Sequence, residues 1–426
     1  MKKAFGLWSA VFMGIGAMVG AGIFIVIGQA GSMAGNIVWL SFIFGGIIAL
    51  LSGYSLAKLA LSYPSRGGII EYLVQEFGVN VFSGGMGILF YFAQLIAIAA
   101  VAKSFGAYAT KLFIGNQSIY WIDLFGVGIV FFFTVVNLIG AAMVAKSENI
   151  IVIIKLSVLV VFVIAALFTI KPALLSFNAT PPISGMFFAI GITFFAYQGF
   201  SVITNTVEDM NNPAKNMLRA MHISILIVAL LYVATSIAVL GNMPLGEVIK
   251  AKDYALALAV KPVFGEIGFK IMAITALIAT ASAINATLYA ATEISYVLAK
   301  DGNLPKVYEY NVFNSFDGLI VSAIITIPMI LFFNLGEITA AAAISMLIIQ
   351  AITHFGHLKV LKNTKANKFA IWLAFIFMTV VAGLTGYYSY KTSPIVVWYL
   401  IGIFIAGFII EIILRKINKR EITSQS

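Results

Sequence analysis

The chain contains no cysteine and very little charge. Only 10% of its 426 residues are Asp, Glu, Lys or Arg, whereas soluble domains carry about 25%. The absence of cysteine excludes disulfides and thiol chemistry. The shortage of charge, together with a hydrophobic content of 62%, excludes an ordinary soluble domain. The sequence therefore predicts an integral membrane protein.

Long stretches without Asp, Glu, Lys or Arg recur along the chain, and about 20 apolar residues are enough to cross a bilayer as a helix. Eleven spans fit into these windows, two of them in 4–57 and one each in 77–102, 124–145, 172–207, 220–246, 271–292, 318–336, 338–358, 369–390 and 392–410. A twelfth apolar segment, 148–169, contains one charge, Lys155. The sequence predicts an all-α membrane protein with 12 transmembrane helices.

Basic residues are unevenly divided between the two sides of this predicted topology. Seventeen Lys and Arg fall on the side of both termini and eight on the opposite side. Because cytoplasmic loops are enriched in Lys and Arg, we expect a multi-pass protein of the cell membrane with both termini in the cytoplasm. The net charge of +10 suits loops that face anionic lipid, and we expect no nucleic-acid partner. The first span is too long for a cleavable signal segment, so we expect it to be retained.

Glycine and alanine crowd the middle of the first span, in "GIGAMVGAGIF" (Gly14–Phe24). The Gly16 and Gly20 pair fits close helix packing, but it also fits a broken helix. A second glycine-bearing interruption, "AYQGF" (Ala196–Phe200), lies in the sixth span. Breaks in corresponding helices are typical of an inverted repeat with a substrate site between them. We therefore predict discontinuous helices 1 and 6.

This interpretation divides the chain into four parts. We predict that 1–170 forms the first inverted repeat (helices 1–5) and that 184–358 forms the second (helices 6–10). Helices 11 and 12 follow in 369–416, and 417–426 is expected to be a cytoplasmic tail.

A break in the first helix would free backbone groups near the middle of the membrane. The inner half would present carbonyls around Gly16 and Ala17, and the outer half would present amides at Gly20, Ala21 and Gly22. Amides at a helix N-terminus favour a carboxylate. Glycine tolerates unwound dihedral angles and leaves no side chain between backbone and ligand.

The sixth helix runs in the opposite direction, so its outer half would end in carbonyls near Phe195 and Ala196 that suit an ammonium group. Tyr197, Gln198 and Phe200 are further candidates to line the pocket, although aromatic side chains in membrane helices more often serve packing. The two breaks together describe a receptor for a zwitterion. Neither break has Asp or Glu nearby, which favours neutral amino acids over cationic ones.

Three motifs carry a resemblance to a known family. They are "GIGAMVGAGIF", "YPSRGGIIEY" (Tyr63–Tyr72) and "EDMNNPAKNMLRA" (Glu208–Ala220). With these motifs the chain resembles the amino acid-polyamine-organocation (APC) transporters over essentially its whole length, although Ile70 replaces a usual tyrosine and Leu218 a usual proline. The resemblance implies a ten-helix inverted-repeat core, two added helices, and secondary active transport of amino acids or related amines.

Lys155 lies about 10 Å into the membrane, seven residues past Glu148. It either extends back to the interface or has a functional role, as intramembrane ionisable residues usually do. The resemblance implies that its ammonium group takes the place of a sodium ion, near the carbonyl of Gly16 and the polar group of Ser282. Because burial favours neutral lysine, we expect Lys155 to carry the coupling proton.

The remaining polar residues give weaker signals. We expect Glu208 and Glu293 to lie at cytoplasmic helix ends in gate or ion-pair roles. His354 and His357, spaced i, i+3, suggest half a metal site, but without a nearby carboxylate we expect them at the membrane interface. His222 begins a span without a partner. We predict no metal and no cofactor.

These observations predict a secondary active transporter for neutral L-amino acids that works by proton-coupled symport and alternating access. An amino acid exchanger and a sodium-coupled carrier stay open as alternatives. A channel needs a continuous polar path, which local breaks do not provide. We expect no enzymatic activity, because the chain has no Cys, no HExxH motif and no buried carboxylate pair. The expected partners are an amino acid, protons and membrane lipid, and the oligomeric state stays open.

Overall fold

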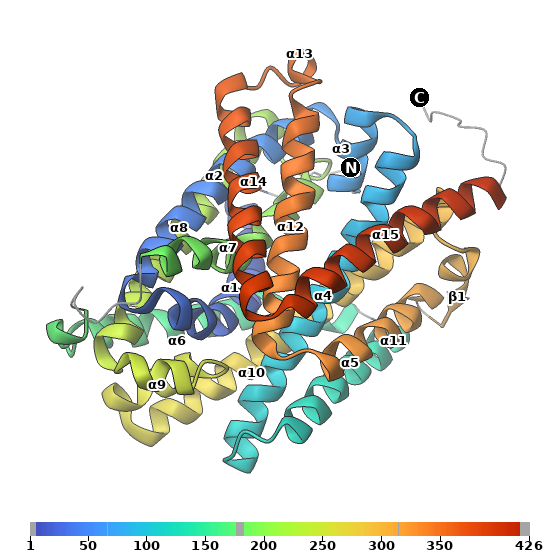
Figure 1. The fold of residues 1–426 in the computed structure, drawn as a ribbon. Coiled ribbons are helices and arrows are strands. Elements are labelled where there is room, and N and C mark those ends of the chain that lie inside the picture. The colour runs from blue at the N-terminus through green and yellow to red at the C-terminus, as the bar shows by residue number, and fades with distance from the viewer. Residues whose placement is uncertain (1–5, 66, 141, 176–182, 314, 418–426) are drawn as a thin grey trace.

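The structure, a computed structural model, describes residues 6–65, 67–140, 142–175, 183–313 and 315–417. Nearly all of them lie in helices (Figure 1). The α-helices are α1 (Leu7–Ala34), α2 (Val38–Ser62), α3 (Ile69–Phe77), α4 (Val81–Ala109), α5 (Ile119–Gly140), α6 (Ala142–Leu167), α7 (Ser184–Tyr197), α8 (Pro213–Asn242), α9 (Leu245–Lys250), α10 (Ala255–Lys300), α11 (Asp317–Phe332), α12 (Leu335–His357), α13 (Leu361–Thr364), α14 (Lys368–Thr392) and α15 (Pro394–Ile417).

Short elements connect these helices. They are the 3-10 helices η1 (Gly35–Ile37), η3 (Pro172–Leu175), η5 (Gln198–Thr206) and η6 (Lys306–Glu309), the π-helical turn η2 (Thr110–Ile114), and two two-residue strands, β1 (Asn311–Val312) and β2 (Ser315–Phe316). The strands pair antiparallel, with Asn311 opposite Phe316. In Figure 1, α3 and α13 lie at the upper end of the molecule and α9 lies at the lower end.

The helices that are long enough to cross a membrane can be compared with the 12 spans that the sequence predicts. Ten helical segments of the described chain are long and apolar enough to cross a membrane, and Leu7–Gly20 and Asp317–Phe332 are shorter apolar helices. The first of the ten, Gly22–Ser62, combines the end of α1 with all of α2. The all-α, multi-pass membrane fold is confirmed, while the count of 12 crossings stays a prediction.

Burial separates central helices from peripheral ones. In the most apolar part of α4, 83% of the residues are buried, compared with 17% in α15. Large apolar side chains on α15, such as Ile395 and Trp398, are exposed. Such a surface suits lipid, because a hydrocarbon environment places no cost on exposed apolar groups. α4 is therefore a central helix, and α15 lies at the periphery.

The core around the predicted breaks is assembled from segments far apart in sequence. α1 packs against α7, η5, α8 and α10, and α2 packs against α7 and α8. α12 packs against α4 and α14, and α10 packs against α4 and α6. The division into two inverted repeats and two added helices stays a prediction.

The first helix differs from its expected form. α1 is one continuous α-helix from Leu7 to Ala34, and it passes through the glycine-rich segment without a break. The physical reason lies in the neighbouring backbone. A Cβ atom on Gly22 would come within 2.5 Å of the Ala196 carbonyl oxygen. A Cβ atom on Gly199 would collide with the backbone of Ala17. In this structure the glycines therefore allow close backbone packing.

The sixth span changes its helix type near the predicted position. α7 ends at Tyr197, and the chain continues from Gln198 to Thr206 as the 3-10 helix η5. A 3-10 segment within a span often marks a hinge or a functional site. The sequence thus located the irregularity, but the chain stays helical through it.

Candidate functional site

The candidate site lies where the middle of α1 meets the junction of α7 and η5. Two glycines bring the two segments together, since Gly199 lies against Ala17 and Gly22 lies against Ala196. Ala17 is exposed, although its neighbours Gly16 and Met18 are buried. Gly16, Gly20 and Gly22 are all buried, and the surroundings of the Ala21 side chain lie outside the described residues. Among the described side chains of this group, Ala17 is therefore the exposed one in this conformation.

A tyrosine from α8 joins the two segments. The Tyr232 hydroxyl lies 2.7 Å from the Met18 carbonyl oxygen and 3.2 Å from the Ala196 carbonyl oxygen. Its side chain is fully buried, and the missing Cβ of Gly22 leaves space for its hydroxyl group. One hydroxyl proton is thus shared between carbonyls of α1 and α7.

The predicted aromatic residues of the sixth span are packed into the core. Phe195, Tyr197 and Phe200 are buried. The Tyr197 hydroxyl donates to the Phe42 carbonyl of α2 at 2.9 Å, and the Phe200 ring lies edge-on to Phe194 at 6.5 Å between centroids. In this conformation these contacts are packing contacts. A direct role in substrate binding stays a prediction.

Gln198, the first residue of η5, is half-buried and belongs to a polar chain. Its Oε1 accepts a hydrogen bond from Gln350 Nε2 of α12 at 2.7 Å. Its Nε2 is enclosed and has no hydrogen-bond partner among the described residues. A buried amide donor without a partner is rare in native structures, so this group has unused binding capacity.

Lys155 is buried inside the bundle with 1% of its surface exposed. Its Nζ donates to the Gly16 carbonyl oxygen at 2.7 Å. A Cβ atom built on Gly20 would lie 3.8 Å from this Nζ and 3.2 Å from the Cβ of Ala283 on α10. The lysine therefore occupies the junction of α1, α6 and α10, and it does not extend to the interface. Ser282, beside Ala283, is also buried.

Lys155 and Tyr232 each donate a hydrogen bond to a backbone carbonyl in the glycine-rich part of α1. In an α-helix, the carbonyls of residues 16 and 18 pair with the amides of residues 20 and 22. Lys155 donates to Gly16 and Tyr232 donates to Met18, so both carbonyls have a side-chain donor besides their helical one. A carbonyl oxygen has two lone pairs, and the helix is retained. The amides of Gly20 and Gly22 therefore share their helical acceptors, the carbonyls of Gly16 and Met18, with these two side chains.

The outer end of α1 is closed by the segment before α10. Gln29 Nε2 donates to Asp253 Oδ1 at 2.7 Å, and Gly28 lies directly against the Lys252 carbonyl. Burial raises the pKa of the Asp253 carboxyl, while Lys252 opposes that rise. This packing joins α1 to 251–254, on the side of the membrane that the charge distribution predicts to be external.

The two histidines of α12 lie inside the helix bundle. His354 and His357 are both fully buried in the last turn of α12, and their placement at the membrane interface stays a prediction. His354 Nε2 lies 2.9 Å from Ser52 Oγ and His357 Nδ1 lies 2.8 Å from Ser55 Oγ. Both serines belong to α2 and lie about 300 positions away in the sequence. No local pattern around the histidines could reveal these partners.

The other predicted polar residues lie apart from the site. Glu208 and Glu293 are exposed, Glu208 after η5 and Glu293 on α10. His222 Nδ1 lies 2.8 Å from the Leu218 carbonyl of its own helix. Within the described ranges, no three His, Asp or Glu side chains are grouped as a metal site would require.

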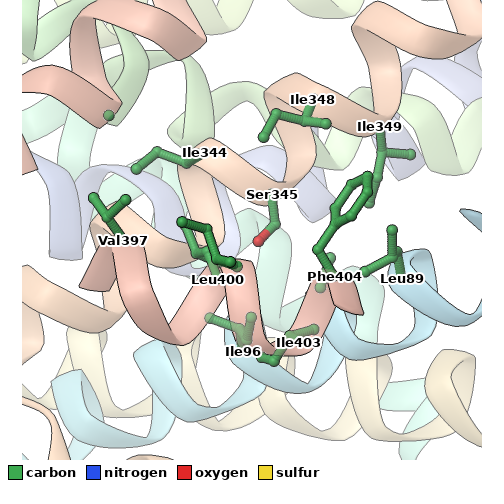
Figure 2. Close-up of a pocket in the computed structure, with 13 residues that line it drawn as sticks. Leu89, Ile96, Ile344, Ser345, Ile348, Ile349, Val397, Leu400, Ile403 and Phe404 are labelled. Carbon is green, nitrogen blue, oxygen red and sulfur yellow. The ribbon is translucent and has the colours of Figure 1, made fainter. Parts of the chain in front are cut away.

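A cavity of about 190 Å³ lies elsewhere, among α4, α12, α14 and α15 (Figure 2). Its lining is aliphatic and aromatic, as Leu89, Leu400 and Phe404 illustrate, and Ser345 is its one polar side chain. The Ser345 hydroxyl already donates to the Ala341 carbonyl. Such a lining offers no partner for the charged groups of a zwitterion. The cavity is therefore distinct from the candidate site.

Three residues of the site were missed at the level of sequence: Tyr232, Gln350 and Ser52. Tyr232 and Gln350 are isolated polar side chains in apolar runs, and polar groups inside a membrane tend to be functional. That signal was available for both. Their partners on α1 and η5 could not be read from the sequence, because they depend on how the helices pack.

Comparison with known proteins gives consistent results. The family profile described as amino acid permease matches residues 5–415. An uncharacterised protein of Methanocaldococcus jannaschii is 38% identical over 98% of this chain and 97% of its own length. The inner membrane transport protein YbaT of Escherichia coli is 39% identical over 82% of this chain and 81% of its own.

Solved structures also match. A manganese transporter of Eremococcus coleocola has a TM-score of 0.63 over 96% of this chain and 95% of its own, at 14% sequence identity. At this low identity the likeness concerns the fold alone.

Proposed function

Since this chain belongs to the amino acid permease family, we propose that it is a proton-coupled symporter of neutral L-amino acids that works by alternating access. The family consists of membrane transporters and not enzymes. The observation that carries the proposal is the bond from the buried Lys155 Nζ to the Gly16 carbonyl oxygen. We infer that this lysine binds and releases the coupling proton.

The proposed substrate site is the crossing of α1 with α7 and η5. The amides of Gly20, Ala21 and Gly22 would bind the substrate carboxylate, and the carbonyls near Phe195 and Ala196 would bind its ammonium group. α1 is continuous here, so binding requires these amides to leave their helical partners. The donors Lys155 and Tyr232 support this step, because they already occupy the carbonyls of Gly16 and Met18.

In the proposed cycle, protonated Lys155 on α6 holds the inner half of α1 through the Gly16 carbonyl, beside Ala283 of α10. Loss of the proton removes this charge-assisted hydrogen bond, which is stronger than a neutral one. The inner half of α1 then loosens and the substrate leaves. Proton entry is thereby coupled to substrate release. We infer that the termini are cytoplasmic in the cell membrane, as the Lys and Arg distribution predicts.

The test is uptake of labelled neutral amino acids into proteoliposomes without sodium, with and without an inward proton gradient. For the wild type we expect saturable uptake that the gradient accelerates. In Lys155→Ala we expect uptake that no longer responds to pH. Lys155→Arg keeps a permanent charge, and we expect it to bind substrate without responding to the gradient. Lys270→Ala, a change at an exposed lysine, is the control and should match the wild type.

Other results would point to the alternatives. Uptake that requires sodium identifies a sodium-coupled carrier. Uptake that ignores the gradient but is driven by amino acid on the opposite side identifies an exchanger. A flux that does not saturate and shows no counterflow identifies a channel.

A further inference from the structure

A chain of buried hydrogen bonds leads from the candidate site into α12 and α2. Gln198 Oε1 accepts from Gln350 Nε2 at 2.7 Å, and Gln350 Oε1 accepts from Ser52 Oγ at 2.8 Å. Ser52 Oγ lies 2.9 Å from His354 Nε2. Ser52, Gln350 and His354 are fully buried. Four side chains from η5, α12 and α2 therefore form one connected line.

With the two carboxamides oriented as in this structure, the direction of every bond in this line follows. An amide oxygen only accepts, so Ser52 gives its single hydroxyl proton to Gln350 Oε1. The Ser52 oxygen must then accept from His354, which fixes the histidine proton on Nε2. His354 thus donates to Ser52, Ser52 to Gln350, and Gln350 to Gln198.

This order fixes the orientation of the Gln198 carboxamide. Its oxygen faces Gln350, and therefore its Nε2 group points away from that residue. This Nε2 is enclosed and has no partner among the described residues. The next residue, Gly199, lies against the backbone of Ala17, which is exposed. Gln198 thus holds a donor without a described partner, one residue before the glycine that contacts α1.

We propose that Gln350, Ser52 and His354 are positioning residues that hold the Gln198 carboxamide so that its Nε2 donates to an acceptor oxygen of the bound amino acid. This inference rests on the proposed function and adds three residues that never touch the substrate. The acceptor is either the carboxylate or a side-chain oxygen of the substrate, and both present the same chemistry to an amide donor.

The experiment measures KM and maximal rate of uptake in proteoliposomes for alanine and serine. Gln350→Leu removes both bonds of Gln350. Gln350→Glu keeps the shape, and when its carboxyl is ionised it cannot donate to Gln198 Oε1, so it favours the reversed carboxamide; its uptake is therefore measured up to alkaline pH, because burial favours the neutral acid. For both variants we expect KM to rise about 3- to 10-fold, the effect of one neutral hydrogen bond, with the maximal rate little changed. Gln75→Leu, the same substitution at an exposed site of α3, should leave KM unchanged.

His354 provides a rescue test. His354→Gln retains an amide Nε2 donor for Ser52, and we expect a KM within about twofold of the wild type. His354→Leu and Ser52→Ala break the line, and we expect them to raise KM as the Gln350 variants do. A merely structural role would make His354→Gln and His354→Leu similar. Thermal unfolding of each purified variant establishes that it is folded, and Ser52→Ala carries the test should a Gln350 variant fail to fold.

The outcomes separate the two proposals. A loss of affinity that is equal for alanine and serine assigns the acceptor to the carboxylate, and a loss for serine alone assigns it to the side chain. Wild-type uptake that saturates, together with an unchanged KM in folded Gln350→Leu, Gln350→Glu and Ser52→Ala, overturns the inference alone. Wild-type protein with no saturable uptake of any neutral amino acid overturns the proposed function and this inference with it.

Discussion

Tyr232 shows how much a single hydroxyl contributes to the site. It lies within hydrogen-bond distance of carbonyls on both α1 and α7. We predict that Tyr232→Phe lowers the stability of the protein by about 1 kcal/mol, the typical net value of one hydrogen bond, and reduces the rate of transport. Differential scanning fluorimetry and proteoliposome uptake measure the two effects. Tyr120→Phe, at an exposed tyrosine of α5, is the control, and equal shifts in both variants would contradict the prediction.

Glu76 is a buried acid outside the membrane spans. It lies on α3 with 6% of its surface exposed, and neither carboxylate oxygen has a hydrogen-bond partner among the described residues. Burial raises the pKa of this carboxyl well above its ordinary value of 4.5, and the nearby Lys359 only partly opposes the rise. The native protein therefore keeps a proton on Glu76 at pH values where the unfolded chain has lost it.

Stability should consequently fall as the pH rises. At Glu76 the native state binds more protons than the unfolded state from about pH 4.5 up to the raised pKa. The contribution of Glu76 to stability is therefore fully present below this window and is lost as the pH rises across it. We predict that Glu76→Gln, which stays neutral, weakens this dependence of the melting temperature on pH. Glu71→Gln, on the same helix but partly exposed, should melt like the wild type at each pH. Identical pH profiles for wild type and Glu76→Gln would refute the prediction.

At the scale of elements, the contact between α1 and η5 depends on Gly199. An added Cβ would meet the backbone of Ala17, which cannot move as a flexible side chain does. We predict that Gly199→Ala lowers stability by about 1–3 kcal/mol, as overpacking does, and strongly reduces uptake. Gly402→Ala on α15 has no atom within 4 Å of the new Cβ. It should be neutral or slightly stabilising, because alanine favours a helix over glycine, and an equal loss in both variants would rule out this mechanism.

The two irregular helices also show what the sequence could and could not predict. The change from α7 to η5 at Gln198 coincides with the interruption expected at "AYQGF". The break expected in α1 is absent from this structure. A broken helix and a close backbone contact require the same small residues, so glycine at Gly16 or Gly22 does not distinguish them.

Side-chain contacts between distant helices could not be predicted from the sequence, for a different reason. The position of Lys155 in its span could be counted, and the resemblance implied Gly16 as its partner. The line from Gln198 to His354 joins segments more than 100 residues apart. Hydrophobic periodicity and local motifs contain no information about such pairings, which only the packing of α2 against α12 creates.

At the scale of the whole molecule, the all-α membrane class followed from composition, and the family from three motifs. Orientation in the membrane is still a prediction, and the absence of cysteine makes it testable, because any introduced thiol is the only one. We predict that Lys261→Cys reacts with a membrane-impermeant maleimide in intact cells. Lys362→Cys, also at an exposed lysine, should react only after permeabilisation. The opposite labelling pattern would reverse the orientation.

The buried position of Lys155 has an electrical consequence. The lysine lies within the apolar segment Ile150–Leu167 and is 1% exposed, so a proton that reaches it from the outer solution crosses part of the membrane's electric field. A full crossing at 100 mV is worth about 2.3 kcal/mol per charge. In the proposed symport a zwitterion and one proton enter together, which moves net positive charge inward. Membrane voltage, and not the pH difference alone, would drive accumulation, and uptake would appear as an inward current.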